Sequence, residues 1–134
     1  MRATTNDFMI DTHSLLWAFM RPQKLGESAR QVFEAVSNNE SNLLIPTIVL
    51  AELIFTIENK PIQADLKTIL ETLQASPNIE FVSLDLQIAL HLPNLTAIPE
   101  MHDRIIVASA LEKQAALITF DKAITESGLV DVIW

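Results

Sequence analysis

Residues 8–20 read FMIDTHSLLWAFM, and this stretch sets the expectation for the whole fold. The apolar run Phe8-Met9-Ile10 is typical of a short buried strand. From Thr12 to Met20 the apolar side chains recur at the spacing of one helix face, so a helix is expected directly after the strand. A buried strand that leads into a helix is the repeating unit of a parallel α/β sheet.

The same alternation continues along the chain. Further short apolar runs predict strands at residues 43–45, 79–82, 117–120 and 130–133. Helical spacing is found at residues 26–38, 47–59, 62–75, 85–92 and 102–115, with a helical turn at 122–127. We therefore predict one three-layer α/β domain over residues 1–134, with a mostly parallel sheet of four to five strands flanked by helices and joined by right-handed crossovers.

The composition excludes several kinds of site. The chain of 134 residues contains no cysteine, which excludes disulfides, cysteine-based zinc sites, iron–sulfur clusters and thiol nucleophiles. Its two glycines are too few for a dinucleotide-binding fingerprint, and their spacing does not fit a Walker phosphate loop. The formal net charge of −8 argues against a broad basic surface for nucleic acid.

The sequence shows no targeting or membrane signal. Residues 1–7 lack the apolar core of a secretory signal. The longest apolar-rich run, residues 43–57, contains Pro46 and Glu52 and is too short to span a bilayer. We therefore expect a cytoplasmic protein with no membrane partner.

Four acids fall where a parallel α/β sheet places its ligands, beyond the carboxyl ends of the strands. Asp11 and Asp121 each follow a predicted strand, and Asp103 begins a predicted helix. Each of these three could equally serve as a helix cap or as a first-turn acid that favours the helix dipole. Glu52 is the only charged residue in the segment 41–57, within a helix expected to be largely buried unless one edge is exposed.

Taken together, the four acids indicate one crevice that contains several carboxylates. Such groups repel one another in a partly dry site, and a divalent cation would relieve that repulsion. Ligand sets made only of oxygen favour Mg²⁺ or Mn²⁺. The corresponding chemistry is metal-assisted hydrolysis of a phosphodiester, with Asp11, Glu52, Asp103 and Asp121 as the catalytic and metal-binding residues.

The histidines and aromatic residues give weaker signals. His13, His91 and His102 have no zinc-binding spacing, and we interpret His102 as a cap of its helix in preference to a phosphate contact. Trp17 and Phe19 belong to an apolar stripe, which we expect to lie in the core or a dimer interface in preference to forming a stacking platform.

Four segments of the chain resemble the motifs of PIN domains and, within that family, of VapC-type toxin ribonucleases. The segments are residues 10–17 (IDTHSLLW), 50–53 (LAEL), 102–110 (HDRIIVASA) and 117–121 (LITFD). They place Asp11, Glu52, Asp103 and Asp121 at the positions of the four acids of the family, and Thr119 at a hydroxyl position that often supports the site.

The resemblance implies an endoribonuclease that depends on Mg²⁺ or Mn²⁺ and hydrolyses single-stranded or looped RNA. It also implies that the protein is the toxin of a toxin–antitoxin pair. The expected partners are a second copy of the chain, in a homodimer, and a small antitoxin whose tail can occupy the active-site groove.

The main alternative is a catalytically inactive PIN-fold module that serves in binding or assembly, and the presence of all four acids argues against it. A phospho-acceptor receiver domain and a haloacid-dehalogenase-like phosphatase are disfavoured. Asp11 has no acidic neighbour, and His13 occupies the place of the second acid of the phosphatase motif. The net negative charge does not exclude RNA, because a metal bound in the crevice would change the local potential. RNA binding is then expected to be weak without metal.

Overall fold

A computed structural model describes residues 6–134 and places five parallel strands in one sheet. The strands are β1 (Asp7–Ile10), β2 (Asn42–Pro46), β3 (Ile79–Val82), β4 (Ala116–Ile118) and β5 (Val132–Ile133). Their order is β3-β2-β1-β4-β5, so β1 is central and β4 lies beside it. The parallel α/β fold predicted from the alternating pattern is confirmed.

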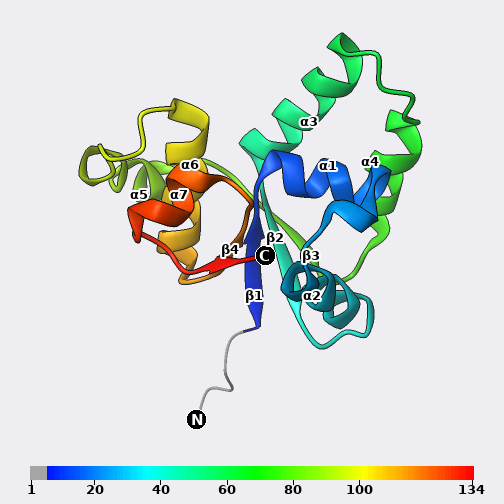
Figure 1. The fold of residues 1–134 in the computed structure, drawn as a ribbon, viewed down its shortest axis with the longest axis horizontal. Coiled ribbons are helices and arrows are strands. Elements are labelled where there is room, and N and C mark those ends of the chain that lie inside the picture. Colours follow the sequence, from blue (N-terminus) through cyan, green and yellow to red (C-terminus); the bar gives the residue numbers. More distant parts are fainter. Residues whose placement is uncertain (1–5) are drawn as a thin grey trace.

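Seven α-helices flank this sheet. They are α1 (Thr12–Met20), α2 (Glu27–Ser37), α3 (Thr47–Asn59), α4 (Leu66–Ala75), α5 (Leu86–Ala89), α6 (Met101–Lys113) and α7 (Lys122–Ser127), with 3₁₀ turns at Pro22–Lys24 and Leu92–Asn94. Figure 1 shows α5, α6 and α7 gathered on one side of the strands and α1 to α4 on the other. Helix α6 packs against β1 and β4, whereas α2 and α3 pack against β2.

The core explains why the strands read as continuous apolar runs. Met9 and Ile10 in β1 point to opposite faces of the sheet, and both are fully buried, as are Leu117 and Ile118 in β4. Both faces of the sheet are therefore covered, which removes the need for polar residues in alternation. Helix α6 is buried along the whole segment Ile105–Ala110, so its central turns lie inside the domain.

Several element ends differ from the sequence-based expectation for local reasons. Helix α4 begins at Leu66 instead of residue 62 because the side chain of Asp65 caps it by accepting a bond from Thr68 N. Helix α6 ends at Lys113 because Gln114 adopts a left-handed conformation with φ of 54°. The expected helix at 85–92 is reduced to the four residues of α5, and the last strand is reduced to Val132–Ile133.

Helix α3 is less buried than its apolar sequence suggested. Val49, Leu53 and Ile57 are buried, but Ala51 is exposed and the side chain of Phe55 is 69% exposed. The helix therefore packs on the core with one stripe and leaves an apolar edge open.

Within residues 6–134, none of the helices combines the length and the apolar character needed to cross a membrane. Residues 1–5, part of the segment in which we expected no secretory signal, lie outside the described chain.

Candidate active site

Asp11 lies directly beyond the carboxyl end of β1 and is only 7% exposed. Its Oδ1 accepts a hydrogen bond from Ser14 N at 3.0 Å, so it caps α1. Its Oδ2 accepts a hydrogen bond from the Thr119 hydroxyl. The two interpretations of Asp11 are therefore compatible, since one oxygen caps the helix while the same carboxylate borders the site cavity.

Thr119 connects Asp11 to Asp121 across the ends of two paired strands. It is fully buried, and its Oγ1 both donates to Asp11 and accepts from Asp121 N at 3.0 Å. Asp121 in turn caps α7 by accepting from Ile124 N at 2.8 Å. The hydroxyl that the family resemblance placed near the site thus holds the two acids in a fixed relation.

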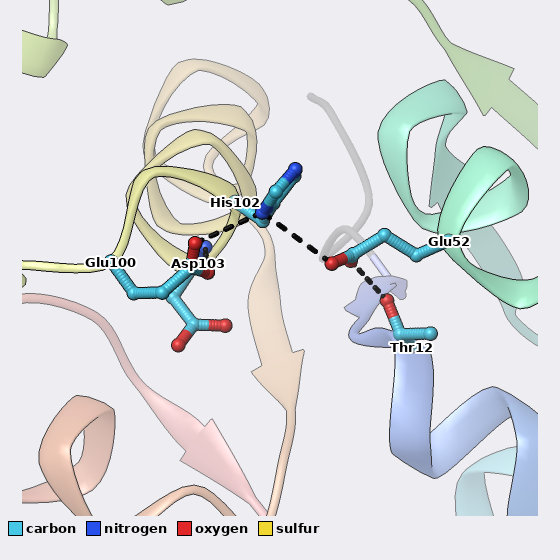
Figure 2. A network of polar contacts seen from close by, with 5 residues as sticks. All are labelled: Thr12, Glu52, Glu100, His102 and Asp103. Carbon is cyan, nitrogen blue, oxygen red and sulfur yellow. Dashed lines mark hydrogen bonds and ion pairs between the residues drawn. The ribbon is translucent and has the colours of Figure 1, made fainter. Parts of the chain in front are cut away.

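Glu52 reaches the site from α3, on the opposite wall. Its Oε1 accepts a bond from Thr12 Oγ1 at 2.6 Å, and its Oε2 lies 3.6 Å from His102 Nδ1. Figure 2 shows the Glu52 side chain between Thr12 and His102. The side chain of Glu52 is 30% exposed, so its carboxylate has polar partners and is partly solvated. It is not enclosed by apolar residues, as a largely buried helix would have implied.

The entry to α6 supplies Asp103 and a further carboxylate, Glu100. Glu100 is the N-cap, since its Oε1 accepts a bond from Asp103 N at 3.1 Å. Its Oε2 lies 2.9 Å from His102 Nδ1 (Figure 2). The interpretation of His102 as the cap is therefore wrong: His102 bridges Glu100 and Glu52. Its contact with Glu100 raises the pKa of the imidazole.

All four predicted acids border a single cavity of about 350 Å³. Glu100, which sequence reasoning missed, also borders it, as do His13, Trp17 and Phe120. Within the described chain, the residues that line this cavity include no lysine or arginine. A search for acids just before the first turn of α6 would have found Glu100.

Burial and repulsion between carboxylates both act in the cavity. The pKa of Asp103 is raised to about 6, first because burial disfavours the charged form and then because Asp121, Glu100, Asp11 and Glu52 are like charges nearby. For Glu100, burial acts to raise the pKa, but hydrogen bonds from His102 and from Asp103 N lower it overall. The charged form of Asp103 is therefore disfavoured both by burial and by its neighbours.

This donor set fits a hard divalent cation by its chemistry, because it is rich in carboxylate oxygens and the cavity lining contains no lysine or arginine. In residues 6–134, however, no group of three or more histidine, aspartate or glutamate side chains is arranged to hold an ion jointly. The carboxylates bond instead to Thr12, Thr119 and His102. Joint ligation therefore requires side-chain movement from these positions.

Trp17 is half-buried against the core, as expected, but it also borders the carboxylate cavity. Phe120, between Thr119 and Asp121, borders the same cavity and is 64% exposed. The stripe pattern of α1 did not indicate that Trp17 reaches the site. Phe19, from the same stripe, packs against the core and borders a different, largely apolar pocket.

Comparisons with known proteins agree with this geometry. The family model of the PIN domain matches residues 8–128. No curated protein matches the sequence. The fold is similar to VapBC2 from Rickettsia felis bound to a promoter DNA fragment, with 17% identity, a TM-score of 0.73, and coverage of 94% of this chain and 96% of that chain.

Two further solved structures have the same fold. DNA-bound VapBC from Salmonella typhimurium is 18% identical, with a TM-score of 0.69 and coverage of 94% and 96% of the two chains. FitAcB from Neisseria gonorrhoeae is 17% identical, with a TM-score of 0.69 and coverage of 93% and 95%. These likenesses concern the fold, whereas the family model spans nearly the whole chain. The chain therefore belongs to the PIN domain family.

Proposed function

We propose that the protein is an endoribonuclease that depends on Mg²⁺ or Mn²⁺ and acts as the toxin of a toxin–antitoxin pair. The observation that carries the proposal is the convergence of Asp11, Glu52, Asp103 and Asp121 on one cavity at the carboxyl ends of β1 and β4. A PIN domain with all four acids in place has the parts of a nuclease, which argues against an inactive binding module.

In this proposal Asp11 and Asp103 are the principal metal ligands, with Glu52 and Asp121 completing the set. When bound, the cation would make hydroxide available near neutral pH and stabilise negative charge on the phosphate oxygens. Thr119 fixes the orientation of Asp11, and Thr12 and His102 fix that of Glu52. One of these carboxylates would orient the attacking water in line with the scissile phosphodiester of single-stranded or looped RNA.

The partners we propose are a second copy of the chain and a small antitoxin. Exposed apolar side chains, among them Leu84, Leu90 and Met101, supply surface for a homodimer. A structural neighbour from Klebsiella pneumoniae, 19% identical with a TM-score of 0.65, is a toxin–antitoxin complex, which supports the antitoxin assignment. We place the active protein in the cytoplasm, where its RNA substrate is found.

RNA cleavage by purified protein tests the proposal. The wild type should cleave single-stranded RNA in Mg²⁺ and lose that activity in EDTA. Asp103→Asn should lower the cleavage rate by at least about a hundredfold, because it removes a proposed ligand while keeping the shape of the side chain.

Asp7→Asn is the matched control, since it removes a carboxylate from the opposite end of the same central strand and should cleave like the wild type. Cleavage that survives EDTA, or an Asp103→Asn protein with full activity, would contradict the proposal. A folded wild type that cleaves no RNA in Mg²⁺ or Mn²⁺ would favour the inactive module instead.

A further inference from the structure

Both tryptophans of the chain lie together beside the carboxylate cavity. The rings of Trp17 and Trp134 have centroids 5.8 Å apart and an interplanar angle of 67°. Phe120 continues the contact, with its ring centroid 5.0 Å from that of Trp134 and an interplanar angle of 35°. Trp17 and Phe120 border the cavity itself. We refer to Trp17, Trp134 and Phe120 as the aromatic row.

The ring of Phe120 lies outside the core and is open to contact with a ligand. Its side chain is 64% exposed, although Thr119 before it is fully buried and Ile118 ends the buried strand β4. The next residue, Asp121, is one of the site carboxylates. An open aromatic face therefore lies one residue from the proposed catalytic group, in a chain that has only eight Phe and Trp residues and no tyrosine.

The row is held in place by the backbone around it. Trp134 O accepts a hydrogen bond from Ser28 N at 3.0 Å, and β5 just before it pairs with β4. A Cβ at Gly26 would lie 2.4 Å from the Trp134 carbonyl carbon, so glycine is needed there for space. The rings therefore form a positioned surface, as a stacking platform requires.

Charges of both signs lie beside the row. Lys24 Nζ lies 5.2 Å from the centroid of the Trp17 ring, which is a cation–π distance. Trp17 and Phe120 both border the acidic cavity, and Phe120 directly precedes Asp121. A nucleic acid strand can use all three features: a cation for one phosphate, aromatic faces for bases, and the carboxylate site for the phosphate to be cleaved.

We propose that the aromatic row is the surface on which bases of single-stranded RNA stack beside the scissile phosphate. This inference rests on the proposed ribonuclease function and adds how the substrate is held. A cavity lined by five carboxylates repels phosphates unless a cation is bound, so uncharged contacts beside it would add to the affinity for RNA. Stacking on aromatic rings supplies such affinity, and it tolerates any base because every base has a flat π-face.

Tryptophan fluorescence reads this surface directly, because Trp17 and Trp134 are the only tryptophans and both belong to the row. The probes are a short single-stranded RNA and an abasic ribose-phosphate strand of the same length. Binding is titrated in Ca²⁺, with a gel to check that the RNA stays intact, and cleavage is measured in Mg²⁺ in parallel. RNA should quench the emission in a saturable way, and the abasic strand should not.

Variants at Phe120 separate the effect of base stacking from the effect of an apolar side chain. Phe120→Leu keeps an apolar side chain and removes the π-face, so it should weaken RNA binding about tenfold, whereas Phe120→Tyr should bind like the wild type. Phe55→Leu is the matched control: Phe55 is 69% exposed but does not border the carboxylate cavity, and the variant should bind RNA normally.

Equal quenching by the abasic strand, or unchanged RNA binding by Phe120→Leu, would overturn the inference. The aromatic row would then be assigned to contact with a protein partner. The proposed function fails separately. If RNA quenches the wild type in a base-dependent way but is not cleaved in Mg²⁺, the proposed stacking surface stands and the proposed nuclease activity is refuted. If the wild type cleaves RNA but shows no base-dependent quenching, the proposed nuclease activity stands and the proposed stacking surface is refuted.

Discussion

Asp7 and Asp11 stand at opposite ends of the central strand β1, and their surroundings differ sharply. Asp7 accepts one hydrogen bond from Asn42 Nδ2 at 2.9 Å, at the end of the sheet away from the cavity. Asp11 is buried, is held by Ser14 N and Thr119, and faces a cavity that contains four further carboxylates. The amino end of β1 therefore holds an acid with a simple hydrogen-bond partner, whereas the carboxyl end brings several like charges together. A purely structural role would not require that repulsion.

Between these two ends lies the apolar core that makes the repulsion tolerable. Met9 and Ile10 are fully buried; Met9 pairs with both β2 and β4, and Ile10 pairs with β4. The core supplies stability that the carboxyl end lowers, which is the usual relation between a scaffold and a functional site. Substitutions in the core, at the carboxyl end and at the amino end should therefore change the free energy of unfolding by different amounts and in different directions.

The largest effect is expected in the core. Leu117→Ala in β4 should lower the free energy of unfolding by about 3 kcal/mol, because the fully buried side chain packs in the core on one face of the sheet and its loss leaves a cavity. Urea denaturation measures the change. Leu86→Ala, at an exposed position of α5, is the control and should stay within about 0.5 kcal/mol of the wild type. Comparable losses in the two variants would contradict the assignment of the core.

The carboxyl end should respond in the opposite direction. In EDTA at pH 7.5, Asp103→Asn should raise the free energy of unfolding by about 1–2 kcal/mol, because it removes a charge that is disfavoured by burial and repelled by its neighbours. The pKa of Asp103 is about 6 in the folded protein and ordinarily 3.8, so the folded state binds the extra proton between these values. The wild type therefore loses stability as the pH rises from about 4 to 6.

Thermal melting of Asp103→Asn and the wild type across this pH range checks the sign. The gain of the variant should approach its full size above pH 6, shrink as the pH falls toward 4 and vanish below that, where Asp103 is neutral in both the folded and the unfolded wild type. A variant that is less stable than the wild type at pH 7.5, or a gain that does not change with pH, would show that repulsion at Asp103 is not what lowers stability.

The smallest effect is expected at the amino end. Asp7→Asn should change the free energy of unfolding by less than about 0.5 kcal/mol, because Asn retains a carbonyl oxygen that can accept the bond from Asn42. The same denaturation series measures it. A stabilisation as large as that of Asp103→Asn would mean that the two ends of β1 do not differ as the structure indicates.

The sequence predicted the elements well where local pattern decides them. Runs such as residues 8–10 and 43–45 have no alternation because both faces of the sheet are covered, and helix α1 has the bounds that its spacing indicated. The strand expected at 117–120 ends at Ile118 because Thr119 turns its hydroxyl to Asp11 and to Asp121 N. That turn depends on contact with a distant strand, which no local pattern reports.

The same distinction applies to the site. Asp11 and Asp121 could be predicted because acids at strand ends converge in any parallel sheet, and Asp103 begins a helix that packs beside them. Glu100 and Phe120 were missed because each looks ordinary in sequence, as a helix cap or an apolar residue. Their positions at the cavity depend on how α6 and β4 are placed by the rest of the fold.

If the carboxylates jointly hold a divalent cation, a Mn²⁺ titration should change the melting temperature of the wild type and not that of a variant that lacks one ligand. The wild type and Asp7→Asn should start low in EDTA and rise with Mn²⁺ to a plateau, because an ion that binds only the folded state stabilises it. Asp103→Asn should start higher and stay flat, so that the curves cross. A flat wild-type curve, or an Asp103→Asn curve that rises as the wild type does, would contradict the account.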